Sequence, residues 1–208
     1  VTTDDSNDEI VYASSMGDGV IQYKNGTPVQ SYNEKNAFKE TAGGYGSGYC
    51  YIDGLAFDKN GNLWMTSSEV NHAVLVLDKA GAWHRLDIEQ LRGVYTINDI
   101  LITSTNDKWI YVPRNTPKLV MIPNSESLDE VSSYEFTTLI DTDGKELTPS
   151  NYTCVAEDKD GYIWVGTNRG AVYFTKPRIS SAEDKAATRC TRVKYTNEET
   201  GNLAYFLD

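Results

Sequence analysis

The sequence contains no apolar run that approaches the ~20 residues needed for a membrane-spanning helix. It is also short of basic residues, since 30 Asp and Glu against 19 Lys and Arg give a net charge of −11 at pH 7. Nucleic acids and anionic membranes are bound by clusters of Lys and Arg that displace counterions. The charge balance therefore excludes both kinds of partner from our expectations and is typical of a chain kept in solution by its charge.

Residues that carry out chemistry are scarce as well. There are two histidines, His72 and His84, in different parts of the chain, and no G-x-S-x-G or H-E-x-x-H motif. Three cysteines, Cys50, Cys154 and Cys190, lack the C-x-x-C spacing of a zinc site. Cys154 is expected to be a small buried residue in a strand. If the protein is extracytoplasmic, a disulfide between Cys154 and Cys190 is an alternative. We expect no cofactor and no metal.

A repeated unit of β-structure is what the sequence does contain. Residues 152–174 hold it in its clearest form, with strands predicted at 155–158, 163–166 and 171–174 and with Asp160-Gly161 as a two-residue hairpin turn. The unit recurs at residues 52–66, with Asn60-Gly61 as its turn, and at residues 97–111. In each copy a Trp follows the first position by twelve residues: Trp64, Trp109 and Trp164.

A fourth, weaker copy at residues 9–23 has Tyr12 in the Trp position, so the steps between these aromatic residues are 52, 45 and 55 residues. Four-stranded propeller blades repeat every ~40 to 50 residues. We therefore predict an all-β chain, a β-propeller segment over residues 1–208 with blade cores near 9–33, 51–88, 97–140 and 152–208. Residues 88–92 are expected to form at most a single helical turn, and residues 180–188 a surface loop or a short helix.

The repeat resembles a known family. Asp158-Lys-Asp-Gly-Tyr-Ile-Trp-Val-Gly-Thr167 is similar to the two-component-regulator propeller repeat nearly position for position, whereas residues 58–67 depart where Gly-Thr becomes Thr-Ser. The third copy lacks the turn Gly, and the first lacks the Trp and the turn. This repeat builds the extracytoplasmic sensor propellers of Bacteroidetes hybrid histidine kinases and the PorZ-like propellers of type IX secretion. The resemblance covers four blade cores and implies architecture more than activity.

Four blades rarely close a ring, so we expect this chain to be a segment of a larger propeller. A strand at the border of such a segment has unpaired backbone groups, which favours self-association through blade edges or pairing with a protein partner. The resemblance implies a location in the periplasm or at the cell surface.

Blade geometry predicts one recognition surface. In a four-stranded blade, the turns between first and second strands lie at one end, and the loops into each new blade lie at the other. Loops held by a rigid scaffold are where binding residues concentrate. We therefore expect a ligand-binding rim around the channel at that second end, formed by Asp53, Asn98, Asp99, Arg114, Asn168, Arg169, Tyr45 and Tyr49.

Each of these features also has a purely structural interpretation. The turn residues at 58–61 and 158–161 resemble a Ca²⁺ loop, but Asx side chains that bond their own backbone explain them better. The three tryptophans are expected in the core between blades rather than as a sugar platform. Arg114 and Arg169 are solvated in the simplest interpretation, and Tyr45 and Tyr49 belong to a Gly-rich loop.

These observations lead to three hypotheses about function. The first is a non-enzymatic sensor that binds an oligosaccharide or another small ligand. The alternative is a cell-surface scaffold of a type IX secretion system. An enzyme similar to the streptogramin lyases is less favoured, because such an elimination requires a general-base His with a metal. His84 alternates with Trp83 on a predicted outer strand, and His72 has no carboxylate partner evident from its spacing.

Overall fold

The computed structural model describes residues 1–4, 7–38, 40, 48–198 and 200–205. Strands dominate these residues. Helical structure is limited to η1 (Glu89–Leu91), a single 3₁₀ turn, and α1 (Ala182–Ala187), which begins after Ser181. The Ser181 side chain accepts a hydrogen bond from the Asp184 N–H, as helix-capping serines do. η1 lies where a single helical turn was expected, and α1 shows that residues 180–188 contain the short helix rather than only a surface loop.

Four antiparallel sheets follow one another along the chain. Sheet 1 consists of β1 (Thr2–Asp4), β2 (Asn7–Gly17), β3 (Gly19–Lys24) and β4 (Thr27–Tyr32). Sheet 2 consists of β5 (Cys50–Phe57), β6 (Leu63–Ser67), β7 (Val74–Leu77) and β8 (Trp83–Leu86). Sheet 3 consists of β9 (Ile100–Ile102), β10 (Lys108–Val112), β11 (Lys118–Ile122) and β12 (Tyr134–Phe136). Sheet 4 consists of β15 (Tyr152–Glu157), β16 (Tyr162–Thr167), β17 (Gly170–Thr175) and β18 (Cys190–Arg192).

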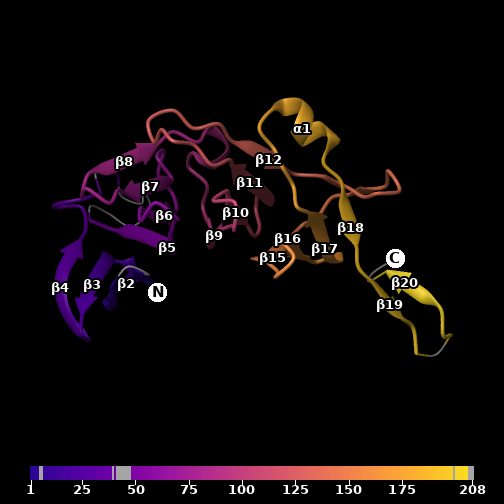
Figure 1. Ribbon diagram of the computed structural model, residues 1–208, viewed down its shortest axis with the longest axis horizontal. Coiled ribbons are helices and arrows are strands. Elements are labelled where there is room, and N and C mark those ends of the chain that lie inside the picture. The colour runs from indigo at the N-terminus through magenta and orange to yellow at the C-terminus, as the bar shows by residue number, and fades with distance from the viewer. Residues whose placement is uncertain (5–6, 39, 41–47, 199, 206–208) are drawn as a thin grey trace.

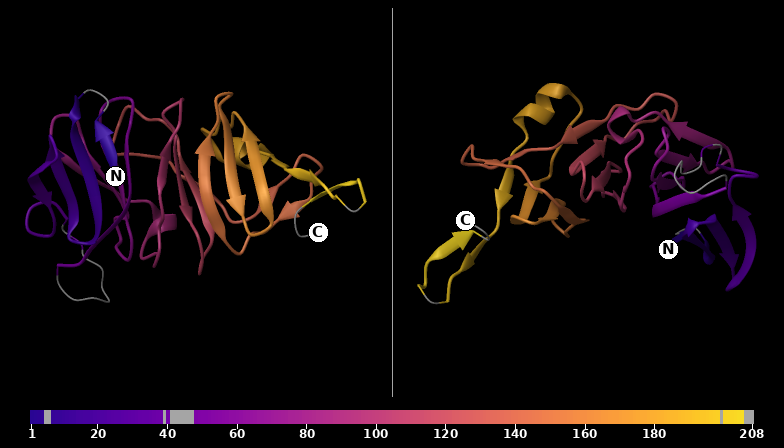
Figure 2. Two further views of the ribbon diagram at one scale, coloured as in Figure 1. Left: turned by 90° about the horizontal axis from the view of Figure 1, so that it is seen from below. Right: turned by 180° about the vertical axis from the view of Figure 1, so that it is seen from behind.

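The four sheets lie along an open arc, with β2, β5, β9 and β15 on its concave side (Figures 1 and 2). Sheets 1 and 2 are joined where the end of β2 pairs with the start of β5, at Met16–Tyr51 and Gly17–Cys50. Farther along, β9 contacts both β5 and β15. This arrangement of up-and-down sheets around a common axis is a partial β-propeller, as the sequence predicted.

Both faces of the middle sheets are buried, because each packs against two neighbours. In β10, Ile110 and Val112 join the core shared with sheet 2, whereas Trp109 and Tyr111 join the core shared with sheet 4. Side chains alternate across a strand, so a strand covered on both faces is apolar at every position. Lys108, also in β10, is the exception and is 2% exposed.

The tryptophans of the repeat do not have identical surroundings. Trp64 and Trp109 are buried, at 2% and 1% exposed, and each packs against the sheet that follows its own. Trp164 is only half-buried and packs on Tyr173 of its own sheet, with 4.8 Å between ring centroids. No further four-stranded sheet covers it among the described residues. The expectation that all three lie between blades therefore holds for two.

The outer strands of sheets 3 and 4 are short, and the chain leaves each sheet after them. After β12 the chain forms β13 (Leu139–Ile140), which pairs with β14 (Glu146–Leu147) instead of continuing sheet 3. After β18 the chain forms β19 (Lys194–Thr196). β19 leaves sheet 4 to pair with β20 (Leu203–Tyr205).

The cysteines also depart from expectation. All three are free, and Cys154 is exposed rather than buried. Cys154 lies on β15 and Cys190 on β18, the two opposite edges of sheet 4, which excludes the disulfide between them. Thr153 is skipped in the pairing of β15 with β16, and this irregularity places Thr153 and Cys154 beside Gly166. A side chain at Gly166 would collide with both, since its Cβ would lie 2.4 Å from the Thr153 Oγ1.

Candidate functional site

The predicted rim is partly assembled on the face of the arc where β5 and β9 begin. Asp53 lies in β5 and accepts a hydrogen bond from the Ser68 Oγ, at 3.3 Å. Ser68 in turn accepts the Ile97 N–H at 2.8 Å, which fixes the chain just before Asn98 and Asp99. Burial raises the pKa of the Asp53 carboxyl, the Ser68 hydrogen bond lowers it, and the charge of Asp99 raises it further. Asp53, Asn98 and Asp99 are thus brought together.

Tyrosines lie next to these acidic residues. Tyr49 and Tyr51 pack with ring centroids 5.3 Å apart, and Tyr95 is 59% exposed. Desolvation and the proximity of Tyr49, Tyr95, Glu69 and Asp53, in that order, raise the pKa of the Tyr51 hydroxyl. Aromatic rings and carboxylates together suit a ligand that has both apolar and hydroxyl or cationic groups. Tyr45, predicted for the same rim, lies outside the described residues.

The remaining rim residues lie at the junction of sheets 3 and 4. Asn168 is occupied structurally, because its Oδ1 accepts the backbone N–H groups of Ser150 and Asn151, at 2.9 and 3.1 Å. Asn98 likewise donates from its Nδ2 to the Tyr111 hydroxyl, at 3.2 Å. Arg114 and Arg169 are exposed on the loops after β10 and β16. Within the described residues, the side chains of Arg114 and Arg169 take part in no hydrogen bond or ion pair.

The acidic turns are structural, as the simpler interpretation held. Asp58 Oδ1 accepts the N–H groups of Asn60 and Asn62, and its Oδ2 accepts the Trp64 Nε1–H at 2.9 Å. Asp158 repeats this pattern with Trp164, at 2.7 Å. The hydrogen bond from Trp164 is the largest cause that lowers the pKa of Asp158. No group of three or more His, Cys, Asp or Glu capable of holding a metal ion occurs among the described residues.

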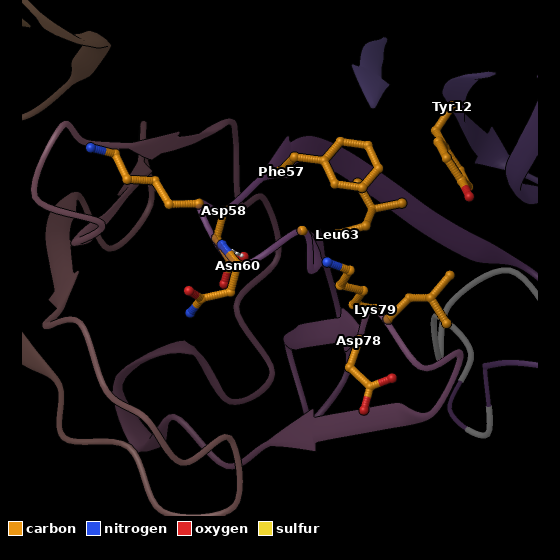
Figure 3. Close-up of a pocket in the computed structure, with 10 residues that line it drawn as sticks. Tyr12, Phe57, Asp58, Asn60, Leu63, Asp78 and Lys79 are labelled. Atoms are coloured by element: carbon orange, nitrogen blue, oxygen red, sulfur yellow. Dashed lines mark hydrogen bonds between the residues drawn. The ribbon is translucent and has the colours of Figure 1, made fainter. Parts of the chain in front are cut away.

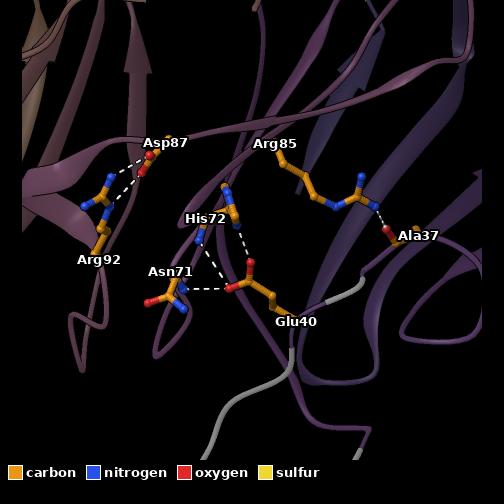
Figure 4. Close-up of polar contacts among 7 residues, drawn as sticks. All are labelled: Ala37, Glu40, Asn71, His72, Arg85, Asp87 and Arg92. Atoms are coloured by element: carbon orange, nitrogen blue, oxygen red, sulfur yellow. Dashed lines mark hydrogen bonds and ion pairs between the residues drawn. The ribbon is translucent and has the colours of Figure 1, made fainter.

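Both histidines have carboxylate partners, although the sequence spacing indicated none for His72. His72 contacts Glu40 through Nδ1, and Glu40 Oε2 also accepts the N–H groups of Asn71 and His72, as Figure 4 shows. His84 Nε2 lies 3.0 Å from Asp78 Oδ2. Asp78 and His84 are six residues apart, like Asp58 and Trp64, and occupy the corresponding places of the β7–β8 hairpin. The sequence offered no signal for Glu40, which is 32 residues from His72.

Two cavities lie on the opposite face of the arc from the rim, at the hairpin turns between first and second strands. The first has a volume of about 320 Å³ and lies between sheets 1 and 2. Tyr12 and Phe57 lie at one side of it and Asp58 and Asn60 at another, and the Lys79 side chain extends into it (Figure 3). The second, of about 340 Å³, lies between sheets 3 and 4 and includes Trp109. This face of the molecule was not predicted to bind a ligand.

Contacts between the turns show that they form one continuous surface. Lys59 Nζ donates to the Ser104 carbonyl, and the Lys59 N–H donates to Asn106 Oδ1 at 3.0 Å. Ser104 in turn donates from its N–H and its Oγ to the two carboxylate oxygens of Glu157, each at 2.5 Å. Turns from sheets 2, 3 and 4 are thus linked side by side.

The family comparison identifies the repeat. A family model described as "Two component regulator propeller" matches residues 146–169, which include β14, β15 and β16. No curated protein sequence matches the chain. No described helix is long and apolar enough to cross a membrane.

Solved structures with similar folds are larger proteins. PorZ, described as an essential bacterial surface component of the type-IX secretion system of Porphyromonas gingivalis, has a TM-score of 0.81 and 18% identity. The alignment covers 99% of this chain and 28% of PorZ. The extracellular domain of a hybrid two component system from B. thetaiotaomicron has a TM-score of 0.58 and 13% identity, with 99% of this chain and 26% of that domain covered.

A protein from Bacteroides uniformis described as a 6-phosphogluconolactonase has a TM-score of 0.52 and 12% identity, over 99% of this chain and 52% of that one. At these identities the likeness shows the fold alone. The chain spans about a quarter of the length of the first two structures. With the family match, these findings support a propeller of the two-component-regulator type.

Proposed function

We propose that the chain is part of a non-enzymatic, extracytoplasmic propeller that serves as a recognition scaffold at the cell surface. The observation that carries this proposal is the similarity to the secretion component PorZ over 99% of the chain at a TM-score of 0.81. His72 and His84 contact carboxylates at separate places, and among the described residues neither pair is joined by a nucleophile or by a third ionisable group capable of holding a metal.

The rim is the part of this scaffold that we propose for recognition. It presents exposed side chains of opposite charge at neighbouring junctions, with Asp99 at one and Arg114 and Arg169 at the other. These residues lie on loops held by buried strands, so their positions are fixed at little further entropic cost. A partner protein or an oligosaccharide with both donor and acceptor groups would complement such a surface.

A sensor for a glycan-derived ligand in the periplasm is the second candidate. It is supported by the two-component-regulator repeat at residues 146–169 and by the likeness to an extracellular sensor domain. The two candidates differ in what binds at the rim. A scaffold holds a protein, whereas a sensor holds a small ligand.

Cross-linking in the cells that make the protein, followed by mass spectrometry, tests the scaffold. We expect cross-links from rim residues to a second protein, and their reduction of at least about tenfold in a Tyr49→Ala, Arg169→Ala double variant, by analogy with interface hot spots. Lys35→Ala, on an exposed turn before β5, is the control. A glycan array tests the sensor with the same variants. Retention of a glycan by the wild type that the double variant loses would favour the sensor, and no rim-dependent partner in either assay would overturn both.

A further inference from the structure

The cavity between sheets 3 and 4 has the features of a binding site that is separate from the rim. It lies among three turns, 103–107 from sheet 3, 157–161 from sheet 4, and 176–178 after β17. Its volume of about 340 Å³ is within the range of small-ligand pockets. Trp109 and Ile163, both buried, and Pro177 form its apolar part.

Some charged side chains around this cavity have hydrogen-bond partners in the described part of the chain, and others do not. Glu157 is held by Ser104, and Asp107 accepts from the Asn124 N–H and the Thr105 hydroxyl, at 2.8 and 2.6 Å. Within the described part of the chain, the side chains of Lys159, Lys176 and Arg178 take part in no hydrogen bond or ion pair. Among lining acids, Asp160 alone has a carboxylate without a described partner. The uncommitted charge is therefore positive, in a chain whose net charge is −11.

The backbone at Lys176 is held in an unusual conformation. Its φ is +46°, in the left-handed region that a non-glycine residue seldom adopts, and Pro177 follows it. Such strain persists only where the surroundings determine it, and it is common at ligand clamps. The Lys176 side chain lies across the hairpin turn, because a Cβ placed on Gly161 would be 3.7 Å from its Cγ and Cε. Its amine is thereby directed along the turn that borders the cavity.

The cavity between sheets 1 and 2 is the same site in an earlier repeat. Strand pairing places Leu63 opposite Leu77 and Ile163 opposite Phe174, so Lys59 corresponds to Lys159 and Lys79 to Lys176. Tyr12 takes the place of Trp109. In this earlier cavity, however, Lys59 donates to Ser104 and no arginine is present. It therefore has one uncommitted cation where the later cavity has three.

At the junction between sheets 2 and 3, the corresponding place is filled by a side chain. There Ser104 and Asn124 stand in the positions of the two lysines, and Lys108 replaces Leu63 or Ile163. The Lys108 amine lies 4.4 Å from the centroid of the Trp64 ring and donates to the Asn106 carbonyl at 2.7 Å. A side chain of the protein thus takes the place that is hollow at the other two junctions.

We propose that the cavity between sheets 3 and 4 binds a small organic anion, whose carboxylate or phosphate is held by Lys159, Lys176 and Arg178 and whose apolar part lies against Pro177. Guanidinium and ammonium groups suit these anions through charge-assisted hydrogen bonds. The proposal does not depend on recognition at the rim, which lies on the opposite face of the arc.

Titration followed by backbone amide NMR tests the site, with benzoate and phenyl phosphate as probes and benzyl alcohol as the neutral counterpart. We expect millimolar benzoate or phenyl phosphate to shift the amides of residues 103–105, 159–161, 176 and 178. The alcohol should not shift them, and inorganic phosphate should bind more weakly because it lacks the apolar part. The stronger of the two organic probes distinguishes a carboxylate site from a phosphate site.

Matched variants complete the test. Lys176→Ala and Arg178→Ala should each weaken binding by roughly tenfold, as expected for one charge-assisted hydrogen bond. Lys79→Ala, at the corresponding place of the earlier cavity, should leave it unchanged. Because all three residues are exposed, the variants are expected to fold, and their amide spectra report this directly. The proposal is overturned if neither organic anion shifts these amides, if benzyl alcohol shifts them equally, or if Lys79→Ala weakens binding as much as Lys176→Ala.

Discussion

At the scale of single residues, the fold depends on a carboxylate and a ring six positions apart. Asp58 with Trp64 and Asp158 with Trp164 close a hairpin and satisfy the indole N–H in the same step. Because the carboxylate also accepts two backbone N–H groups of the turn, one side chain fixes both the turn and the orientation of the ring. The repeated sequence motif is therefore a structural device and not an ion site.

The two buried tryptophans and Trp164 should respond differently to truncation. We expect Trp64→Ala and Trp109→Ala each to lower the free energy of unfolding by about 3–5 kcal/mol, as buried aromatic residues do. Trp164→Ala should cost less than half of this, because Trp164 is half-buried against Tyr173. Urea denaturation monitored by far-UV circular dichroism measures all three. Equal losses for the three variants would contradict the structure's distinction between them.

Lys108 should make stability depend on pH at the alkaline side. Burial lowers its pKa from the ordinary value of 10.5, although the charges of Asp58 and Asp107 oppose this. The ammonium form is thus less favourable in the folded chain than in the unfolded one. This unfavourable contribution is complete below the folded pKa and disappears as the pH rises through it toward 10.5.

A variant Lys108→Met removes the charge and keeps the length of the side chain. We expect it to match or exceed the wild type by about 1 kcal/mol at neutral pH, because replacing a buried charge by an apolar group is often neutral or stabilising. The advantage should shrink as urea titrations are repeated at increasing pH. The exposed Lys35→Met serves as the control. If Lys108→Met were strongly destabilised at neutral pH, the contacts of the amine with Trp64 and Asn106 would outweigh its burial.

At the scale of elements, hydrogen bonds from single side chains hold loops in place. Glu40 joins the loop between β6 and β7 by accepting the N–H groups of Asn71 and His72 and by contacting the His72 ring. Burial alone would raise the pKa of Glu40, but the hydrogen bonds from His72 and Asn71 outweigh it, and the pKa is lowered. The carboxylate form is therefore the one that holds this loop.

Removing the Glu40 carboxylate should free that loop without unfolding sheet 2. In Glu40→Ala, we expect the amides of Asn71 and His72 to exchange with deuterium faster, by roughly tenfold, since each loses a charge-assisted hydrogen bond. Residues of β6 and β7 should exchange at their wild-type rates. Hydrogen–deuterium exchange with Glu126→Ala, an exposed carboxylate elsewhere, as the control makes the comparison. Unchanged exchange at residues 71 and 72 would show that Glu40 does not hold the loop in solution.

At the scale of the whole molecule, one arc separates two surfaces. The rim, with its carboxylates, tyrosines and two arginines, lies on the face where the inner strands begin. The opposite face, at the hairpin turns between first and second strands, has repeated cavities bordered by lysines. The central strands of sheets 2 and 3 between them are buried on both faces, so they hold the two surfaces in a fixed relation. This separation is what allows one propeller to hold a partner on one face and a small ligand on the other, as we propose.

The sequence by itself determined the repeat, the strands and the turns, because these follow from local chemistry. Hairpin residues such as Asp160-Gly161 and Asn60-Gly61 require particular backbone angles, and alternating apolar strands must be covered. It also predicted the roles of Asp58 and Asp158, whose partners lie within six residues. Asp-Lys is repeated at residues 58–59 and 158–159. This repetition is a sequence signal for the lysine-bordered cavities, which were not predicted.

Only the tertiary structure decided which residues far apart in the chain meet. Glu40 reaches His72, and Ser104 reaches Glu157, across 32 and 53 residues. It also decided that Cys154 is exposed, that Trp164 differs from Trp64, and that Lys108 occupies one junction while two others are hollow. The physical reason is that burial at a junction depends on the neighbouring sheet, whose side chains come from another repeat. No pattern within one repeat specifies what the next one places against it.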